Sequence, residues 1–331
     1  MPINRNIFLV TGAAGFIGAA LVNRLLDNGE FVIGIDNLND YYDPNLKIAR
    51  LNFIKKRKLK NGARWIFRKL SLEETEKLEE IAKSYSPTVI IHLAAQAGVR
   101  YSITNPDEYL KSNIVGFNNI LNLSKEFKIK HLIFASTSSV YGDNKNFPLQ
   151  ESFNTEKPLS FYAASKKSNE VMGYSYSNIF KLPITCLRFF TVYGPFGRPD
   201  MALHLFTEAI IKNKPVKLFS KGNHVRDFTY VEDVVKSIVP LIKKPPSGQI
   251  PYETFNICNG YPKKLSYFLK LIEKYLSKKS KKILLPPQKG DVYKTHGSNK
   301  LIINKTNYKI QTSIEEGIKK FINWYKEYYK L

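Results

Sequence analysis

The stretch Ile7-Phe-Leu-Val-Thr-Gly-Ala-Ala-Gly-Phe-Ile-Gly18 decides the fold of this chain of 331 residues. Its first five residues predict a buried strand, and a helical pattern follows the glycines and runs to Asn28. Glycine allows backbone conformations and close approaches that a Cβ would block. The start of the next helix offers unpaired N–H groups and a positive dipole end to an anion. In this strand–loop–helix context, the spacing Gly-x-x-Gly-x-x-Gly predicts the pyrophosphate loop of a dinucleotide site.

A carboxylate follows the second predicted strand, residues 31–35. Asp36 lies about twenty residues after the glycine loop, where an acidic side chain accepts hydrogen bonds from ribose hydroxyls. A 2′-phosphate beside this carboxylate would be repelled, so Asp36 predicts NAD as the cofactor. Lys47 and Arg50 follow in the chain and leave NADP open as the alternative.

Strand and helix patterns alternate through the first half of the chain. Short, nearly continuous apolar runs predict strands, and the longer patterns between them predict helices. This alternation is typical of a parallel sheet that helices cover on both faces. We therefore expect an α/β fold with a doubly wound parallel sheet, a Rossmann lobe that binds NAD, followed by a smaller mixed α/β lobe. The further predicted strands are 64–69, 88–93 and 131–135, and the predicted helices between them are 73–84 and 106–127.

The pattern becomes shorter and more irregular in the second half of the chain. This change predicts an NAD-binding domain at residues 1–182, with returning segments around 226–258. Residues 183–331 are then expected to form a substrate domain that is interleaved with the first.

A hydroxyl-rich segment, Ser136-Thr-Ser-Ser139, follows the apolar run 131–135. Its side chains are expected at the carboxyl end of a strand, where open α/β sheets bind ligands. Tyr162 and Lys166 lie four residues apart on a predicted helix that starts after Pro158-Leu-Ser160, so their side chains share one face. A nearby cation stabilises phenolate, which allows a tyrosine to act as a base near neutral pH.

The chain contains three Tyr-x-x-x-Lys matches, and their contexts differ. Tyr141 and Lys145 enclose the turn sequence Gly-Asp-Asn, which breaks helical facing. Tyr275 and Lys279 have no hydroxyl-bearing strand before them. Only Tyr162 and Lys166 follow both a hydroxyl-rich strand end and the helix-start signal Pro158-Leu-Ser160. Thr137 of that strand end can bind the same substrate oxygen as the phenol. The predicted catalytic residues are therefore Thr137, Tyr162 and Lys166.

The composition is strongly basic, with 51 Lys and Arg against 28 Asp and Glu and a formal net charge of +23. Such an excess suits nucleic acid, a membrane surface or a phosphate-bearing substrate. The excess is almost all lysine scattered over predicted helix faces, which favours solvated side chains. We expect no nucleic-acid partner.

Cysteine and histidine usage indicates neither a disulfide framework nor a metal site. Cys186 and Cys258 have no framework spacing, and the five histidines have no metal spacing. This pattern predicts no metal and a reducing, cytoplasmic location. The chain has no apolar run of about 18 residues and no signal-peptide pattern, so we expect no membrane insertion.

Seven motifs occur along the chain: the glycine loop 11–18, Asp36-Asn37, His92-Leu-Ala-Ala95, Ser136-Thr137, Tyr162-x-x-x-Lys166, Arg188-Phe-Phe-Thr-Val-Tyr-Gly-Pro195 and Arg226-Asp-Phe228. Together they resemble the extended short-chain dehydrogenase/reductase family over nearly the whole chain. Three more specific stretches are Gly34-Ile-Asp-Asn-Leu-Asn-Asp-Tyr-Tyr-Asp43, Gln96-Ala-Gly-Val-Arg-Tyr-Ser102 and Gly197-Arg-Pro-Asp-Met-Ala202. These resemble the UDP-glucuronate 4-epimerases within that family.

The resemblance implies a tightly held NAD that takes a hydride from C4 of a UDP-sugar and returns it through a transient 4-keto intermediate. Tyr162 would remove the proton of the C4 hydroxyl, and Thr137 would orient that hydroxyl. Lys166 would hold the phenolate and the nicotinamide ribose. The expected reaction is 4-epimerisation of UDP-glucuronate to UDP-galacturonate, and the expected assembly is a homodimer.

Residues near the predicted catalytic threonine separate this reaction from related ones. The resemblance implies that Ser138, Ser139 and Thr191 grip the sugar carboxylate, which hydroxyls can do without acting as acid or base. Related 4,6-dehydratases carry an Asp-Glu pair at the positions of Ser138 and Ser139, and related decarboxylases carry a Glu at that of Ser139. The alternatives that stay open are a UDP-glucuronate decarboxylase, a 4-epimerase of neutral UDP-hexoses such as UDP-glucose and UDP-galactose, and a catalytically silent nucleotide sensor.

The resemblance also assigns residues to each ligand. Arg198 and Arg226 are expected to bind the diphosphate, Phe219 to stack on uracil and Asp291 to accept from the uridine ribose. A departure occurs at Ser71, where many family members carry an Asp that contacts adenine. The cofactor-binding residues are expected to be Gly12, Gly15, Phe16, Ile17, Gly18, Asp36, Asn37, Leu93, Ala94, Ala95, Gln96, Asn113, Ser136, Tyr162, Lys166 and Phe189. The substrate-binding residues are expected to be Arg100, Ser102, Ser138, Ser139, Thr191, Arg198, Phe219, Arg226 and Asp291.

Overall fold

The computed structural model describes residues 6–59, 62–287 and 292–331, which form two compact units. Unit 1 contains Met1–Gly142, Asn154–Arg188 and Ile238–Phe255. Unit 2 contains Asp143–Phe153, Phe189–Ser237 and Asn256–Leu331. The sequence analysis assigns NAD to one domain and the substrate to the other. This assignment of a ligand to each part of the chain stays a prediction.

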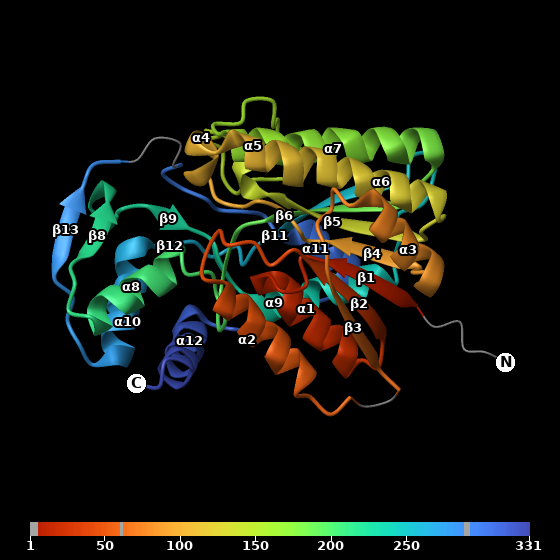
Figure 1. Cartoon of the computed structure of the whole chain (residues 1–331). Coiled ribbons are helices and arrows are strands. Elements are labelled where there is room, and N and C mark those ends of the chain that lie inside the picture. Colours follow the sequence, from red (N-terminus) through yellow and green to blue (C-terminus); the bar gives the residue numbers. More distant parts are fainter. Residues whose placement is uncertain (1–5, 60–61, 288–291) are drawn as a thin grey trace. The chain divides into compact units, whose positions relative to one another are not determined.

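Seven strands form the main sheet (Figure 1): β1 (Ile7–Thr11), β2 (Phe31–Asp36), β3 (Arg64–Lys69), β4 (Val89–His92), β5 (His131–Thr137), β6 (Ile184–Phe189) and β11 (Tyr252–Ile257). Their order is β11-β6-β5-β4-β1-β2-β3, and β1 pairs in parallel with β2 and with β4. The chain thus winds outward in both directions from β1, and doubly wound sheets bind ligands at this switch point. The predicted α/β class is confirmed.

Helices cover both faces of this sheet (Figure 1). On one face lie α1 (Phe16–Asp27) and α2 (Pro44–Lys55), which contact each other. On the other face, α6 (Gly116–Glu126) packs against α3 (Thr75–Tyr85) and α7 (Phe161–Phe180). No helix in the described ranges is both long enough and apolar enough to span a membrane.

The core of unit 1 lies where β-strand and helix side chains meet. Leu9 of β1 is opposite Ile33 and Ile90 of the neighbouring strands, and all three side chains are fully buried. Phe117 and Ile120 of α6 belong to the same cluster. Strands covered on both faces read as apolar runs, which is why the sequence pattern predicts β1, β2 and β4.

The helix predicted at 106–127 consists of three parts. It contains α5 (Pro106–Tyr109), a π-helical segment labelled η1 (Leu110–Val115) and α6. A short helix, α4 (Tyr101–Thr104), precedes it. A π-helical turn leaves a carbonyl without its usual intrahelical partner, and such turns are frequent at functional sites. The pattern of apolar residues does not reveal this turn, because the turn depends on a hydrogen-bond donor from another helix.

Unit 2 combines short sheets with an aromatic core. Its strand pairs are β7 with β10, β8 with β13 and β9 with β12. Phe228 and Phe268 stack at 4.1 Å, and Phe321 is fully buried in the same cluster. The elements are β7 (Thr191–Tyr193), α8 (Ala202–Ile211), β8 (Val216–Phe219), β9 (Val225–Arg226), β10 (Phe228–Tyr230), α9 (Val231–Ile242, which continues into unit 1), β12 (Lys263–Lys264), α10 (Leu265–Leu276), β13 (Lys282–Leu285), α11 (Lys300–Thr306) and α12 (Ile314–Tyr328).

Candidate active site

The glycine loop joins β1 to α1 and requires its glycines. Gly12 has a φ of +70°, and a Cβ there would lie 2.7 Å from the backbone nitrogen of Ala94. A Cβ on Gly18 would lie 2.0 Å from the carbonyl oxygen of Gly12. The backbone of the loop therefore stays close to the start of α1, where helix N–H groups can bind a phosphate.

Asp36 is fixed beside this loop at the end of β2. Its Oδ2 accepts a hydrogen bond from the Ala14 backbone N–H at 3.1 Å, and its Oδ1 accepts one from Leu38 at 2.9 Å. The carboxylate is therefore held in one orientation near the loop. A group that binds ribose hydroxyls needs such a fixed orientation.

The two basic residues that left NADP open are buried in α2 and bind protein oxygens. Lys47 Nζ donates to the backbone and side-chain oxygens of Asn39 at 2.8 and 2.7 Å. Arg50 donates to the Ala14 carbonyl at 2.9 Å and to the Tyr42 hydroxyl at 2.6 Å. Burial lowers the pKa of Lys47, while the charge of Asp36 acts in the opposite direction. Both cations are therefore bound by oxygen atoms of the protein itself.

The hydroxyl segment begins at the last residues of β5, as the sequence predicts. Thr137 Oγ1 accepts a hydrogen bond from the backbone N–H of Ser139 at 3.2 Å and lies 3.3 Å from its hydroxyl. A short 3-10 turn, η2 (Ser138–Tyr141), follows. The side chains of Thr137 and Ser139 therefore form one small cluster of hydroxyls.

Tyr162 and Lys166 occupy the first turns of α7. Ser160 caps this helix, since its hydroxyl accepts from the Ala163 backbone N–H at 3.1 Å. The predicted helix start is confirmed, and the four-residue spacing directs Tyr162 and Lys166 to one face. The Tyr162 ring meets the ring of Tyr109 edge to face, with centroids 6.0 Å apart.

Lys166 is 1% exposed, and its Nζ has no hydrogen-bond partner among the described residues. Burial lowers its pKa to about 8, while the charges of neighbouring groups oppose that shift. A buried ammonium without a partner is costly, because it loses its hydration without a replacement. Ribose hydroxyls of a dinucleotide would supply the missing acceptors, so this residue fits NAD.

Asn113 connects the loop after β4 to α7. Its side chain accepts from the Gln96 backbone N–H at 2.8 Å and donates to the Gln96 carbonyl at 3.0 Å. Its Nδ2 also donates to the Ser165 hydroxyl, next to Lys166, at 2.9 Å. Two predicted cofactor residues, Gln96 and Asn113, are therefore brought together, and Asn113 lies within the π-helical turn that the sequence did not reveal.

Among the other predicted cofactor residues, Phe16 and Ile17 begin α1, and the rest lie at or just after the ends of β2, β4, β5 and β6. Ala94 donates its backbone N–H to the Thr11 hydroxyl at 3.1 Å, next to the glycine loop. Asn37 Nδ2 lies 3.4 Å from the hydroxyl of Ser71, the position that departs from the family. Phe189 is the buried last residue of β6.

The predicted substrate residues are distributed over both units. In unit 1, Arg100 directly precedes α4, and Ser102 is buried within it and donates to the Val99 carbonyl at 2.7 Å. In unit 2, Arg198 pairs with Asp200 at 2.5 Å. Arg226 donates to the backbone oxygens of Val225 and Tyr293, Thr191 starts β7 and Phe219 ends β8. Asp291 lies outside the described residues.

An anchor in unit 2 was missed by the sequence analysis. Asp227 is fully buried, and its carboxylate accepts backbone hydrogen bonds from Asn259 at 2.8 Å, Gly260 at 3.0 Å and Gly297 at 3.1 Å. It therefore fixes the chain directly after Arg226. In the sequence, an aspartate next to an arginine suggests an ion pair between the two. The local pattern therefore does not indicate that Asp227 binds distant backbone N–H groups.

A doubly wound sheet with a glycine loop, a carboxylate fixed beside that loop and a Tyr/Lys helix defines a dinucleotide-dependent enzyme of the short-chain dehydrogenase/reductase type. The NAD dependent epimerase/dehydratase family model matches residues 8–258. The chain belongs to this family, and its cofactor is NAD.

Similarity to individual proteins extends over nearly the full chain. Protein CapI of Staphylococcus aureus is 46% identical over 97% of this chain and 99% of its own length. A probable UDP-glucuronate 4-epimerase of Rhizobium meliloti is 42% identical over 98% of both chains. The solved structure of the UDP-glucuronic acid 4-epimerase from Bacillus cereus, in complex with UDP-glucuronic acid and NAD, has a TM-score of 0.90 at 31% identity and covers 97% of this chain and 99% of that one.

Proposed function

We propose that this enzyme catalyses the NAD-dependent 4-epimerisation of UDP-glucuronate to UDP-galacturonate through a 4-keto sugar, without decarboxylation. The observation that carries the proposal is the buried ammonium of Lys166, one helical turn after Tyr162, with no hydrogen-bond partner in the described part of the chain. An amine placed this way lowers the energy of a phenolate and can bind a ribose. The full-length similarity to enzymes named for UDP-glucuronate supports the choice of substrate.

The chain's own residues would perform the proton chemistry and hold the sugar. Tyr162 accepts the proton of the C4 hydroxyl and returns it after the sugar has turned over. Thr137 orients that hydroxyl, and Lys166 stabilises the phenolate form of Tyr162. Bound NAD supplies a reversible hydride acceptor at C4.

Retention of the carboxylate distinguishes this reaction from decarboxylation. A 4-keto uronate is a β-keto acid and loses CO2 when its carboxylate can rotate freely. We propose that Ser138 and Ser139 hold the carboxylate through hydroxyl hydrogen bonds, together with Thr191. Neither serine offers a group that would act as an acid or base toward the intermediate.

The nucleotide part of the substrate is assigned by family resemblance. We propose that Arg198 and Arg226 bind the diphosphate, because guanidinium groups suit phosphate geometry. Phe219 would stack on uracil, and Arg100 would contact the sugar. Each of these contacts with the substrate is a proposal.

Incubation of the purified protein with UDP-glucuronate, followed by chromatography of the sugar nucleotides, tests the function. The expected product is UDP-galacturonate, and the Tyr162→Phe variant should lose about a hundredfold or more in turnover. UDP-pentose and CO2 as the only products would show a decarboxylase. Faster turnover of UDP-glucose than of the uronate would show an epimerase of neutral hexoses.

We also propose a homodimer that forms through α7. Three apolar side chains on this helix are strongly exposed, namely Val171 at 58%, Ile179 at 63% and Phe180 at 46%. Exposed apolar side chains on one helix favour an interface, and a second copy of the same helix would bury part of this surface. A cytoplasmic location is the matching proposal for a chain with two buried free cysteines.

A further inference from the structure

Glu170 is a buried carboxylate one helical turn after Lys166 on α7. Its side chain forms a bidentate ion pair with Arg188 of β6, in which Nε donates to Oε1 at 2.9 Å and Nη2 donates to Oε2 at 2.8 Å. Glu170 is 4% exposed and Arg188 is 5% exposed. Neither the predicted proton chemistry nor the predicted cofactor contacts use this pair.

The same ion pair binds the chain on both sides of residues 137–139. Ser136 donates its hydroxyl to Glu170 Oε1 at 2.6 Å. Arg188 Nη1 donates to the Tyr141 hydroxyl at 3.0 Å, and its guanidinium lies 4.9 Å from the centre of that ring. Ser136 and Tyr141 flank residues 137–139, so one ion pair is bonded to the chain on each side of the three hydroxyls that are predicted to bind the substrate.

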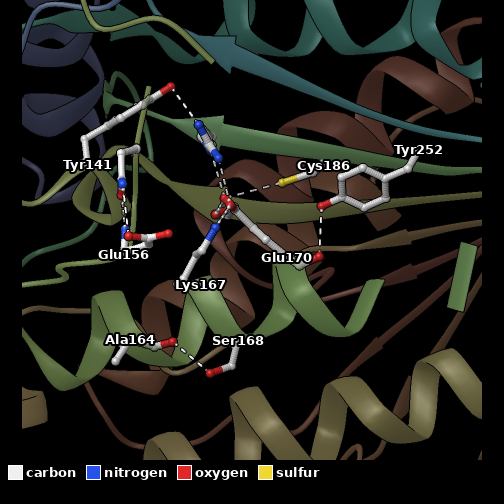
Figure 2. Close-up of polar contacts among 11 residues, drawn as sticks. Tyr141, Glu156, Ala164, Lys167, Ser168, Glu170, Cys186 and Tyr252 are labelled. Atoms are coloured by element: carbon white, nitrogen blue, oxygen red, sulfur yellow. Dashed lines mark hydrogen bonds and ion pairs between the residues drawn. The ribbon is translucent and has the colours of Figure 1, made fainter. Parts of the chain in front are cut away.

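The helix side of this arrangement is also fixed. The Tyr252 hydroxyl of β11 donates to the Glu170 carbonyl at 3.2 Å, and the Cys186 thiol lies 3.7 Å from Glu170 Oε1 (Figure 2). Stability alone does not explain a buried ion pair, because an apolar pair of similar volume is often as stable or more so. Directional bonds from this pair to four groups, namely Ser136, Tyr141, Tyr252 and Cys186, define a geometry that apolar packing would not.

We propose that Glu170 is a positioning residue that acts through its ion pair with Arg188. It sets the position of residues 136–141 relative to the face of α7 that carries Tyr162 and Lys166. The inference deepens the proposed epimerase function and rests on it. Residues that hold reacting groups in place contribute strongly to rate, because small misplacements of those groups are costly.

The charge of Glu170 also acts on Lys166. Burial lowers the pKa of Lys166 to about 8, and the negative charge of Glu170 opposes this shift. Although burial would raise it, the Arg188 guanidinium holds the pKa of Glu170 below its usual value. Glu170 is therefore a carboxylate at neutral pH.

The other titratable groups around this pair are neutral or cationic at neutral pH. Burial, and then the charge of Lys166, lowers the pKa of His92 in β4 to about 3. Burial raises the pKa of Cys186 and that of Tyr252, so both keep their protons. Lys167 Nζ lies 3.7 Å from Glu170 Oε2 at the edge of the network. Removal of the Glu170 charge therefore leaves an excess of positive charge around Lys166.

Two variants of Glu170 separate the effect of its charge from the effect of its side-chain length. Glu170→Gln keeps the shape of the side chain and removes its charge, so we expect kcat to fall about tenfold to a hundredfold, with KM changed less than about threefold. The basic limb of the pH profile of kcat should move down by roughly 0.5 to 1 pH unit, because Lys166 then loses its proton more readily. Glu170→Asp keeps the charge and shortens the reach, so kcat should fall while the basic limb stays in place.

Glu156→Gln is the matched control, since it makes the same chemical change on an exposed carboxylate that accepts from Asn154 Nδ2 at 3.0 Å. Its kcat and pH profile should equal those of the wild type. Tyr141→Phe removes one hydroxyl from the far end of the network and should lower kcat severalfold if Glu170→Gln does not fold.

Wild-type kcat and an unmoved basic limb in folded Glu170→Gln would overturn the inference. So would a loss of activity that only follows the folded fraction, without movement of the basic limb. If Glu170→Gln does not fold, unchanged kcat in both Glu170→Asp and Tyr141→Phe has the same meaning. A wild-type protein that does not convert UDP-glucuronate is a failure of the proposed function instead, and the parallel wild-type assay shows it.

Discussion

The carbonyl oxygen of Asn113 accepts a hydrogen bond from the side-chain amide of Asn169 at 2.6 Å. Asn113 lies in the π-helical turn Leu110–Val115, and Asn169 lies on α7, two turns after Tyr162. A helix that changes register leaves a carbonyl to be satisfied from outside, and Asn169 satisfies it. This bond keeps the Asn113 side chain free to hold Gln96 and Ser165.

Replacement of Asn169 by alanine should therefore affect both stability and cofactor retention. We expect the free energy of unfolding to fall by about 1 to 3 kcal/mol, because a buried carbonyl loses its partner. We expect weaker NAD binding as well, since Asn113 would no longer hold the loop at Gln96. Urea unfolding and measurement of co-purified NAD test the two effects.

Asn178→Ala is the control on the same helix, because Asn178 is exposed. It should leave both quantities unchanged. Equal stability and equal NAD content in the two variants would show that the π-helical turn does not depend on Asn169.

A methyl group on Gly18 should abolish cofactor binding. The added Cβ would lie 2.0 Å from the Gly12 carbonyl oxygen, which is backbone and cannot rotate away. Gly18→Ala therefore forces the phosphate loop apart, and we expect no NAD in the purified protein and no activity. Absorbance of the purified protein and titration with NAD measure the loss.

The same substitution at Gly173 provides the comparison. Gly173 also lies in a helix, but a Cβ there would contact only side-chain atoms, at 3.3 Å or more. We expect a stability within about 1 kcal/mol of the wild type, because alanine favours the helix while the neighbouring rings adjust slightly. NAD binding by Gly18→Ala at wild-type affinity would contradict the role of the loop.

Most strands of the main sheet could be predicted because they are nearly continuous apolar runs. The runs 7–11 and 31–35 are strands in the structure, and Tyr162 and Lys166 lie on a helix that starts where the sequence indicated. The sequence did not predict β11, the edge strand of the sheet, whose segment Tyr-Glu-Thr-Phe-Asn-Ile is half polar. An edge strand needs less apolar surface, so its pattern is weak.

Long-range contacts explain what the sequence could not reveal in the site. Ser136 was predicted as a cofactor residue, yet its hydroxyl binds Glu170, which is 34 positions away. Asp227 follows Arg226 in the chain, but the partners of its carboxylate lie 32 to 70 positions away. Local spacing identifies residues that share a helix face or a loop, whereas these bonds depend on the packing of separate elements.

A charged residue on the exposed face of α7 should separate the proposed dimer. Ile179→Lys places a cation where the side chain is 63% exposed in the single chain and would be buried between two copies. We expect the molar mass from light scattering to fall by half, with little change in the secondary structure. Ile283→Lys, at a 42% exposed apolar position in unit 2, should keep the wild-type mass. An unchanged mass in Ile179→Lys would exclude α7 as the interface.

Lys166 should lower the stability of the NAD-free protein in a pH-dependent way. Its pKa falls from 10.5 to about 8 on burial, so the folded state binds fewer protons than the unfolded state between these values. Stability from this group therefore rises as pH increases from about 8 to about 10.5, and the cost of burying the charge is fully present below pH 8. Lys166→Met removes that cost, and we expect NAD-free protein at pH 7 to gain on the order of 1 kcal/mol of unfolding free energy while turnover is lost. Lys130→Met, at an exposed position, should change neither quantity. Urea unfolding at pH 7 and pH 10 measures the difference, which should shrink at the higher pH; a variant less stable than the wild type at pH 7 would show that the ammonium contributes favourable contacts in the folded protein.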